Sequence, residues 1–193
     1  MPDVRERLSG GPGPVERFAN LIPSPVATQA LAPAGADVVL IDQEHGPIGL
    51  EGMHAMVAST AGTACSPWVR VPGCHEASVK AALDAGAEGI VFPLVTTAKS
   101  AADCVALTRY PPEGRRGWGP FVAHSRWGVG LFDYLSQRGG ETVCTLYRLP
   151  RWAFRLAAQY VATFAVDTSI RRPRPRPSVD LTAAASWLTL GDH

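Results

Sequence analysis

Short runs of hydrophobic residues recur along the chain, and each run ends at a turn or at polar residues. The runs are rich in Val, Ile, Leu and aromatic residues, and they lack strict alternation of hydrophobic and polar positions. This pattern is typical of strands that are buried on both faces, as in parallel sheets. It predicts five strands, within residues 18–23, 36–42, 66–73, 87–95 and 142–147.

Helical segments are predicted between these strands, at residues 49–62, 74–87 and 96–110, the last with Thr96 or Thr97 as its N-cap. Open doubly wound sheets and closed (β/α)₈ barrels both show such an alternation of strands and helices. A barrel usually needs about 250 residues, and the chain has 193. The pattern alone therefore leaves both α/β folds open, and a barrel would be incomplete, with about five to six βα units.

The last part of the chain differs in character from the rest. Arg and Pro alternate in "RRPRPRPS" at residues 171–178, a pattern that fits neither a helix nor a central strand. We therefore divide the chain into a folded domain, residues 1–146, and an Arg/Pro-rich tail, residues 147–193. The tail is interpreted as poorly folded or as an unusual connection, with an ordinary exposed linker as the alternative, and binding to nucleic acid is a minor hypothesis.

The overall composition narrows the class of protein. The formal net charge is +1, which favours neither a nucleic-acid nor a membrane partner. Neither a long apolar run nor an N-terminal apolar segment is present, so a cytoplasmic location is predicted. Four cysteines without a C-x-x-C pair are interpreted as buried free thiols, at positions Cys65, Cys74, Cys104 and Cys144.

Charged side chains follow the predicted strands where these end. Asp42, Glu44 and His45 come directly after one strand, and Arg70 lies at the end of the next. Because the carboxyl ends of parallel strands share one rim, these groups are expected to converge on one pocket. His45 has the chemistry of a general acid or base, although a structural role stays open. The partner of Arg70 is either a structural carboxylate or a carboxylate substrate.

Two further candidates rest on weaker grounds. Asp84 falls on the helix after the third strand, where a solvated acid at a helix end is the simpler interpretation. Arg126 lies in the string "AHSRWG", which is expected to be a loop that follows a long Pro-, Gly- and Arg-rich loop at residues 109–120. Loops of that length tend to be functional or mobile, although a plain surface connection is the alternative.

Several strings taken together resemble the HpcH/HpaI aldolase family, also called the citrate lyase β-subunit-like family. They are "AGADVVLIDQEHGP", "PWVRVPG", "ALDAGAEGIVFPLV" and "RYPPEGRRGWGP…SRW", and their order and spacing match over residues 4–146. The resemblance implies a (β/α)₈ barrel with a swapped final helix, assembled as a homo-oligomer, either a hexamer or a trimer. It implies cleavage of a 4-hydroxy-2-oxo acid to pyruvate and an aldehyde with Mg²⁺ or Mn²⁺.

The resemblance also assigns roles to residues. It implies that His45 is the catalytic base, that Asp84 orients His45, and that Arg70 holds the oxo acid and its enolate. Asp42 is then placed near the aldehyde end, and Arg126 is expected to bind substrate.

The metal positions depart from the family pattern. The family holds its metal with a Glu after the fifth strand, in a "Q-x-E-T" context, and with an Asp after the sixth. Here the Gln position is Arg148 and the Glu position is Pro150. Neither residue replaces a carboxylate ligand, and Asp180 is a weak candidate for the Asp. A frameshift near codon 147 is one hypothesis for this departure. A catalytically inactive family member, or a fragment that associates with other copies, is the alternative function.

Overall fold

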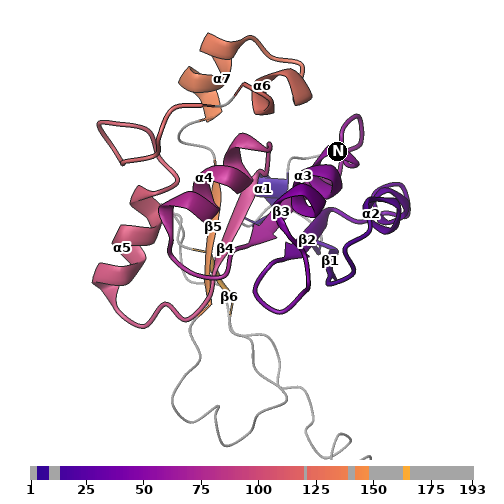
Figure 1. Ribbon diagram of the computed structural model, residues 1–193, viewed down its shortest axis with the longest axis horizontal. Coiled ribbons are helices and arrows are strands. Elements are labelled where there is room, and N and C mark those ends of the chain that lie inside the picture. Colours follow the sequence, from indigo (N-terminus) through magenta and orange to yellow (C-terminus); the bar gives the residue numbers. More distant parts are fainter. Residues whose placement is uncertain (1–3, 9–13, 120, 139–141, 148–162, 166–193) are drawn as a thin grey trace, which may run out of the picture.

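The computed structural model describes residues 4–8, 14–119, 121–138, 142–147 and 163–165. In this part of the chain a six-stranded sheet runs in the order β1-β2-β3-β4-β5-β6 (Figure 1). The first five strands are parallel and confirm the five predicted strands: β1 Arg17–Asn20, β2 Val38–Asp42, β3 Ser66–Arg70, β4 Gly89–Phe92 and β5 Val143–Tyr147. The last strand, β6 (Thr163–Ala165), pairs antiparallel with β5 and so departs from the pattern of a (β/α)₈ barrel.

The predicted helices between the strands are confirmed with shorter bounds: α3 Leu50–Ala58, α4 Glu76–Asp84 and α5 Ala98–Ala106. Thr97 caps α5 through a reciprocal pair of hydrogen bonds with Ser100. Further helices were not expected: α1 Val4–Leu8, α2 Pro25–Leu31, α6 Ala123–Arg126 and α7 Leu131–Arg138. The expectation of a loop at "AHSRWG" is therefore wrong, because α6 lies within it. Across the described segments, no helix has the length and apolar character needed to cross a membrane.

The two faces of the sheet bury different side chains, since successive residues of a strand point in opposite directions. One face packs against the helices between the strands and carries Val39, Ile41 and Val69. The opposite face carries Val38 and Trp68, which pack with residues of α1. Asp42 and Arg70 follow these two residues at even spacing, so they belong to the same face as Val38 and Trp68.

A close packing contact explains a glycine at the start of β4. A Cβ atom at Gly89 would lie 2.6 Å from the Trp68 ring, which is nearer than any real contact. Glycine therefore leaves the space that the buried indole occupies on this face of the sheet.

The two ends of the sheet carry different connections. The strand-to-helix loops, such as residues 43–49 between β2 and α3, follow the carboxyl ends of the strands. The carboxyl end of α4 returns the chain to the amino ends, where β4 begins. Helix α6 lies at this amino end too, because Trp127, which follows α6, contacts Gly86 just after α4 (Figure 1).

The prediction of buried free thiols is confirmed for three cysteines and wrong for one. All four cysteines are free; Cys65, Cys104 and Cys144 are buried, whereas Cys74 is exposed. Cys74 lies in the turn before α4 rather than in a packed element. Burial raises the pKa of the Cys65 thiol to about 11, as expected for a thiol that serves as a small apolar side chain.

Candidate functional site at the carboxyl end of the sheet

A buried ion pair joins the ends of β2 and β3. The register of the two strands sets Asp42 directly beside Arg70. The Nε–H of Arg70 donates to Oδ1 of Asp42 at 2.9 Å, and Nη2 donates to Oδ2. The carboxylate of Asp42 is fully buried, while the side chain of Arg70 is 19% exposed. This two-pronged contact fixes the orientation of the guanidinium at the rim.

The same carboxylate also organises the loop that follows β2. Oδ1 of Asp42 accepts hydrogen bonds from the backbone N–H groups of Glu44, at 3.0 Å, and His45, at 3.1 Å. Burial would raise the pKa of the Asp42 carboxyl, but the hydrogen bonds from Arg70 and from these two N–H groups outweigh burial and hold that pKa below its ordinary value. Asp42 therefore stays ionised and holds the loop in place.

Gly46 closes the turn, and its position leaves no room for a side chain. Its N–H donates to the carbonyl oxygen of Asp42 at 3.2 Å. A Cβ atom at this position would lie 2.5 Å from the same oxygen. The loop is also tied to β3, since the N–H of Gln43 donates to the carbonyl oxygen of Arg70 at 3.0 Å.

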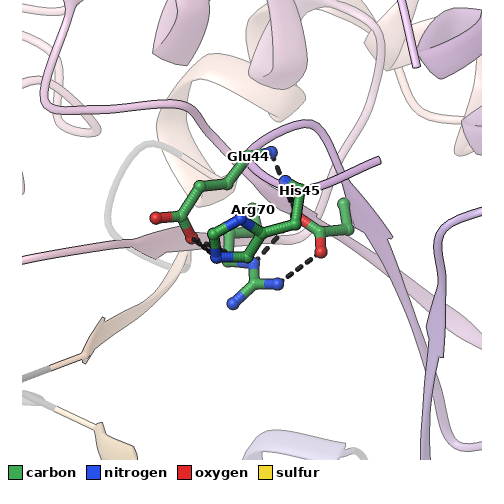
Figure 2. A network of polar contacts seen from close by, with 4 residues as sticks. Glu44, His45 and Arg70 are labelled. Atoms are coloured by element: carbon green, nitrogen blue, oxygen red, sulfur yellow. Dashed lines mark hydrogen bonds and ion pairs between the residues drawn. The ribbon is translucent and has the colours of Figure 1, made fainter. Parts of the chain in front are cut away.

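Glu44 lies between the guanidinium and the imidazole. Its Oε2 atom is 3.4 Å from Nε of Arg70 and 3.5 Å from Nε2 of His45. Figure 2 shows the three side chains converging at one place. The side chain of Glu44 is 16% exposed, whereas that of His45 is 63% exposed. The site thus grades from a buried carboxylate, through a half-buried ion pair, to an imidazole that is exposed to solvent.

The structure thus brings together three of the predicted site residues, namely Asp42, His45 and Arg70. The carboxylate partners of Arg70 at this rim are Asp42 and Glu44, which favours the structural-carboxylate interpretation of its charge. The sequence pattern identifies Glu44 as a charged residue after a strand and does not indicate a role for it. The signal that could have identified it is its position, directly before His45 and opposite the end of β3.

Asp84 lies at the other end of the sheet. It is the last residue of α4, which runs from the carboxyl ends of the strands back to their amino ends. Its Oδ1 accepts a hydrogen bond from Nη2 of Arg116 at 3.1 Å. The side chain of Arg116 is 1% exposed, and its guanidinium lies 4.5 Å from the centre of the Tyr110 ring. Within this chain, then, Asp84 is not brought to His45, and its orienting role stays a prediction.

Arg126 also lies at the amino end. Its Nη1 donates to the carbonyl oxygen of Ala85, and Nε1 of Trp127 donates to the carbonyl oxygen of Gly86 at 3.2 Å. These two donors satisfy carbonyl groups just beyond α4, as basic side chains commonly do at helix C-termini. The structure therefore places Arg126 apart from Arg70, and the expectation that it binds substrate stays a prediction.

The expected divalent metal does not fit the described residues. Within the ranges that the structure covers, no group of three or more His, Cys, Asp or Glu side chains is arranged to hold a metal ion. Asp42 is already engaged by Arg70 and by two backbone N–H groups. Arg148, Pro150 and Asp180 lie outside the described residues, and the first two carry no carboxylate.

The structure has a parallel sheet with an Arg, a His and two carboxylates at its carboxyl end. This arrangement is typical of the class of α/β proteins that place reactive groups on this rim. The model of one family, HpcH/HpaI aldolase/citrate lyase, matches residues 21–168. The chain belongs to the HpcH/HpaI aldolase/citrate lyase family. The match continues past residue 146, where the motif resemblance ends.

Curated proteins and solved structures agree with this membership. The chain is 42% identical over 123 residues to a hydroxypyruvate/pyruvate aldolase of Paraburkholderia phytofirmans, covering 63% of this chain and 45% of that protein. It is 39% identical over 139 residues to a 4-hydroxy-2-oxovalerate aldolase of Novosphingobium aromaticivorans, covering 71% and 52%. A family structure from Burkholderia cenocepacia aligns with a TM-score of 0.67 at 33% identity, covering 74% of this chain and 58% of that one. The chain thus spans about half the length of the curated relatives that it matches.

Proposed function

We propose that the chain is a carbon–carbon lyase that cleaves a 4-hydroxy-2-oxo acid to pyruvate and an aldehyde. The observation that carries the proposal is the contact of Glu44 with both His45 and Arg70, which holds a base and a cation at the same rim. Family membership supports the reaction type, since the matched relatives bear the names of aldolases that handle pyruvate or 2-oxo acids.

The roles of the residues follow from the reaction. His45 takes the proton of the C4 hydroxyl, the C3–C4 bond breaks, and its electron pair passes into the C2–C3 enolate of pyruvate while the aldehyde carbonyl forms. Arg70 supplies a fixed positive charge toward the carboxylate and the developing enolate. Protonation of C3 then completes pyruvate. Asp42 keeps the guanidinium in place and is proposed to lie near the aldehyde end.

The charge balance of the rim explains why this chemistry calls for a further cation. One guanidinium faces two carboxylates, Asp42 and Glu44, so little positive charge remains for an enolate. A bound Mg²⁺ or Mn²⁺ would supply Lewis-acid stabilisation of the enolate oxygen. Because the described residues do not form its site, no step is assigned to the metal.

A second candidate function is a catalytically inactive family member or a fragment that associates with other copies. The specific observation that favours it is the presence of Pro150 where the family carries a metal-binding Glu, with Arg148 at the Gln position of the same motif. Such a protein would keep the rim of His45 and Arg70 and would bind an oxo acid without cleaving it. A homo-oligomer, either a hexamer or a trimer, and a cytoplasmic location stay predictions for both functions.

Pyruvate release tests the proposal. The purified full chain is supplied with 4-hydroxy-2-oxopentanoate over a range of Mn²⁺ concentrations, and pyruvate is followed by NADH oxidation with lactate dehydrogenase. We expect Mn²⁺-dependent release that falls at least about 100-fold in His45→Ala. His54→Ala is the matched control, since His54 is exposed on α3. Absence of release at any metal concentration, or equal release by His45→Ala, would refute the activity.

A further inference from the structure

Within this chain, the acid that the structure describes next to the imidazole of His45 is Glu44, whereas the family resemblance assigns Asp84. Asp84 lies at the amino end of the sheet and is held by Arg116. Glu44 has its Oε2 atom 3.5 Å from Nε2 of His45. An exposed imidazole on a loop needs such a partner, since a side chain that is 63% exposed is not held by packing.

Glu44 is itself held firmly enough to position another group. Its backbone N–H donates to Asp42 at 3.0 Å, its side chain is only 16% exposed, and its carboxylate lies 3.4 Å from Nε of Arg70. The chain of contacts therefore runs from the buried Asp42 through Arg70 and Glu44 to the exposed imidazole. The first three members are buried or largely buried, and only the imidazole is exposed.

We propose that Glu44 is the positioning residue for His45, holding the imidazole by Nε2 so that Nδ1 is presented as the proton acceptor. The described charged groups that face the imidazole are Glu44, from the same loop, and Arg70, from β3, whose guanidinium contacts Glu44. The proton at Nε2 is favoured next to a carboxylate, and the other ring nitrogen is then the basic one. Its effect on catalysis rests on the proposed function, whereas its effect on the ring does not.

Ring mobility tests the positioning role without any activity. The side-chain order parameter of the His45 ring is measured by ¹³C relaxation in the full chain and in Glu44→Gln, Glu44→Asp and Glu51→Gln. We expect the ring to pass from rigid toward flexible values in Glu44→Gln, and Glu44→Asp to restore part of the order. Glu51→Gln is the matched control, since Glu51 is an exposed acid at the start of α3, and it should change nothing.

Two results would overturn the proposal at this stage. One is a His45 ring that stays equally ordered in Glu44→Gln while the variant keeps the wild-type far-UV circular dichroism. The other is a ring that becomes mobile in Asp84→Asn but not in Glu44→Gln. If Glu44→Gln does not fold, Glu44→Asp gives the same reading, because its shorter side chain still loosens a ring that depends on Glu44.

A double-mutant cycle tests whether Glu44 acts through His45 in catalysis. Glu44→Gln should lower kcat about 10- to 100-fold, as expected when a reacting group is misplaced by about 1 Å, with KM changed less than about twofold. In a His45→Gln background the same substitution should have less than about a twofold effect. Fully additive effects, or a rise in KM alone, would show that Glu44 acts on Arg70 and not on the base. If the chain has no aldolase activity, the double-mutant cycle gives no result, and the measurement of ring mobility alone decides the proposal.

Discussion

The two ends of the sheet use charged residues in opposite ways. At the carboxyl end, the ion pair of Asp42 and Arg70 supports a loop whose last member, His45, is 63% exposed. At the amino end, Arg116 is almost fully buried against Asp84 and Tyr110. Arg126 donates a hydrogen bond to a backbone carbonyl group there. At the first end the charged groups lead to an exposed side chain, and at the second end they are enclosed and hold the chain together.

This difference follows from chain direction. Strand ends in a parallel βα fold leave loops at the carboxyl rim that can vary and carry reactive groups, whereas the amino rim receives the helix ends and serves stability. Substitutions at the amino end should therefore lower stability and spare catalysis. Substitutions at the carboxyl end should affect both, because Asp42 serves the strands and the reactive loop at once.

The largest effect is expected at Asp42. Asp42→Ala removes the buried partner of a largely buried guanidinium and the oxygen that accepts from both loop N–H groups, so the free energy of unfolding should fall by about 3–5 kcal/mol. Urea unfolding followed by circular dichroism measures this loss, and Asp42→Asn, which keeps one acceptor, should cost less. A loss below about 1 kcal/mol in Asp42→Ala would mean that the rim does not depend on this pair.

The next effect is expected at Arg116, at the opposite end. Arg116→Ala removes a buried side chain and leaves Asp84 without its partner, so we expect a loss of about 2–4 kcal/mol in unfolding free energy. The folded fraction should keep its kcat/KM, which a coupled pyruvate assay below the melting temperature checks. A kcat/KM lowered more than about fivefold would contradict the separation between the two ends.

Acid should weaken the ion pair at the carboxyl end. The pKa of Asp42 is lower in the folded chain than its ordinary value, which is about 3.9 in an unfolded chain. The ion pair of Asp42 and Arg70 therefore stabilises the folded chain fully at a pH above the unfolded pKa. This stabilisation is lost as the pH falls through the folded pKa. This loss of unfolding free energy at low pH is one part of the loss that Asp42→Ala causes.

Unfolding measured from pH 7 to pH 2 should show this loss, with a shallower slope in Asp42→Asn. Some slope remains in that variant, because at Asp37 the desolvation that would raise the pKa is outweighed by the backbone N–H of Glu16 and by Arg7, which leave that pKa lowered as well. Identical slopes in the wild type and in Asp42→Asn would contradict the ionised pair.

The smallest effect is expected at Arg126. Arg126→Met keeps much of the apolar length of the side chain and loses the hydrogen bond to the carbonyl oxygen of Ala85, which should cost about 1 kcal/mol. The structure places this residue far from the rim, so KM for the oxo acid should change less than twofold. A KM raised more than tenfold would instead support the substrate-binding role that the family resemblance implies.

Much of the fold could be predicted from the sequence because strands buried on both faces leave a plain signal. The five parallel strands, the helices between them and the rim of Asp42, His45 and Arg70 all follow from apolar runs and from the groups at their ends. The apolar runs indicate parallel strands, and they do not report the direction of a strand that departs from this arrangement. Strand β6 is such a strand, since it pairs antiparallel with β5.

The roles of side chains across the fold were harder to predict. Within this chain Asp84, at the carboxyl end of α4, lies near the amino ends of the strands, and its orienting role toward His45 stays a prediction. That geometry could have been worked out from helix direction alone. Glu44 could not be assigned, since its contacts depend on the register that sets Asp42 beside Arg70. Burial of Arg116 depends on packing between a loop and α4, which no local pattern reports.

Binding of pyruvate to the folded chain tests the central claim most directly. The ring signals of His45 and the Nε–H signal of Arg70 are followed by NMR as pyruvate is added in the presence of Mg²⁺. We predict saturable shifts at these two groups and binding at least tenfold weaker in Arg70→Lys, which keeps the charge and loses the two-pronged contact. Shifts confined to Arg126 and Trp127, or equal binding by Arg70→Lys, would contradict a ligand site at the carboxyl end of the sheet.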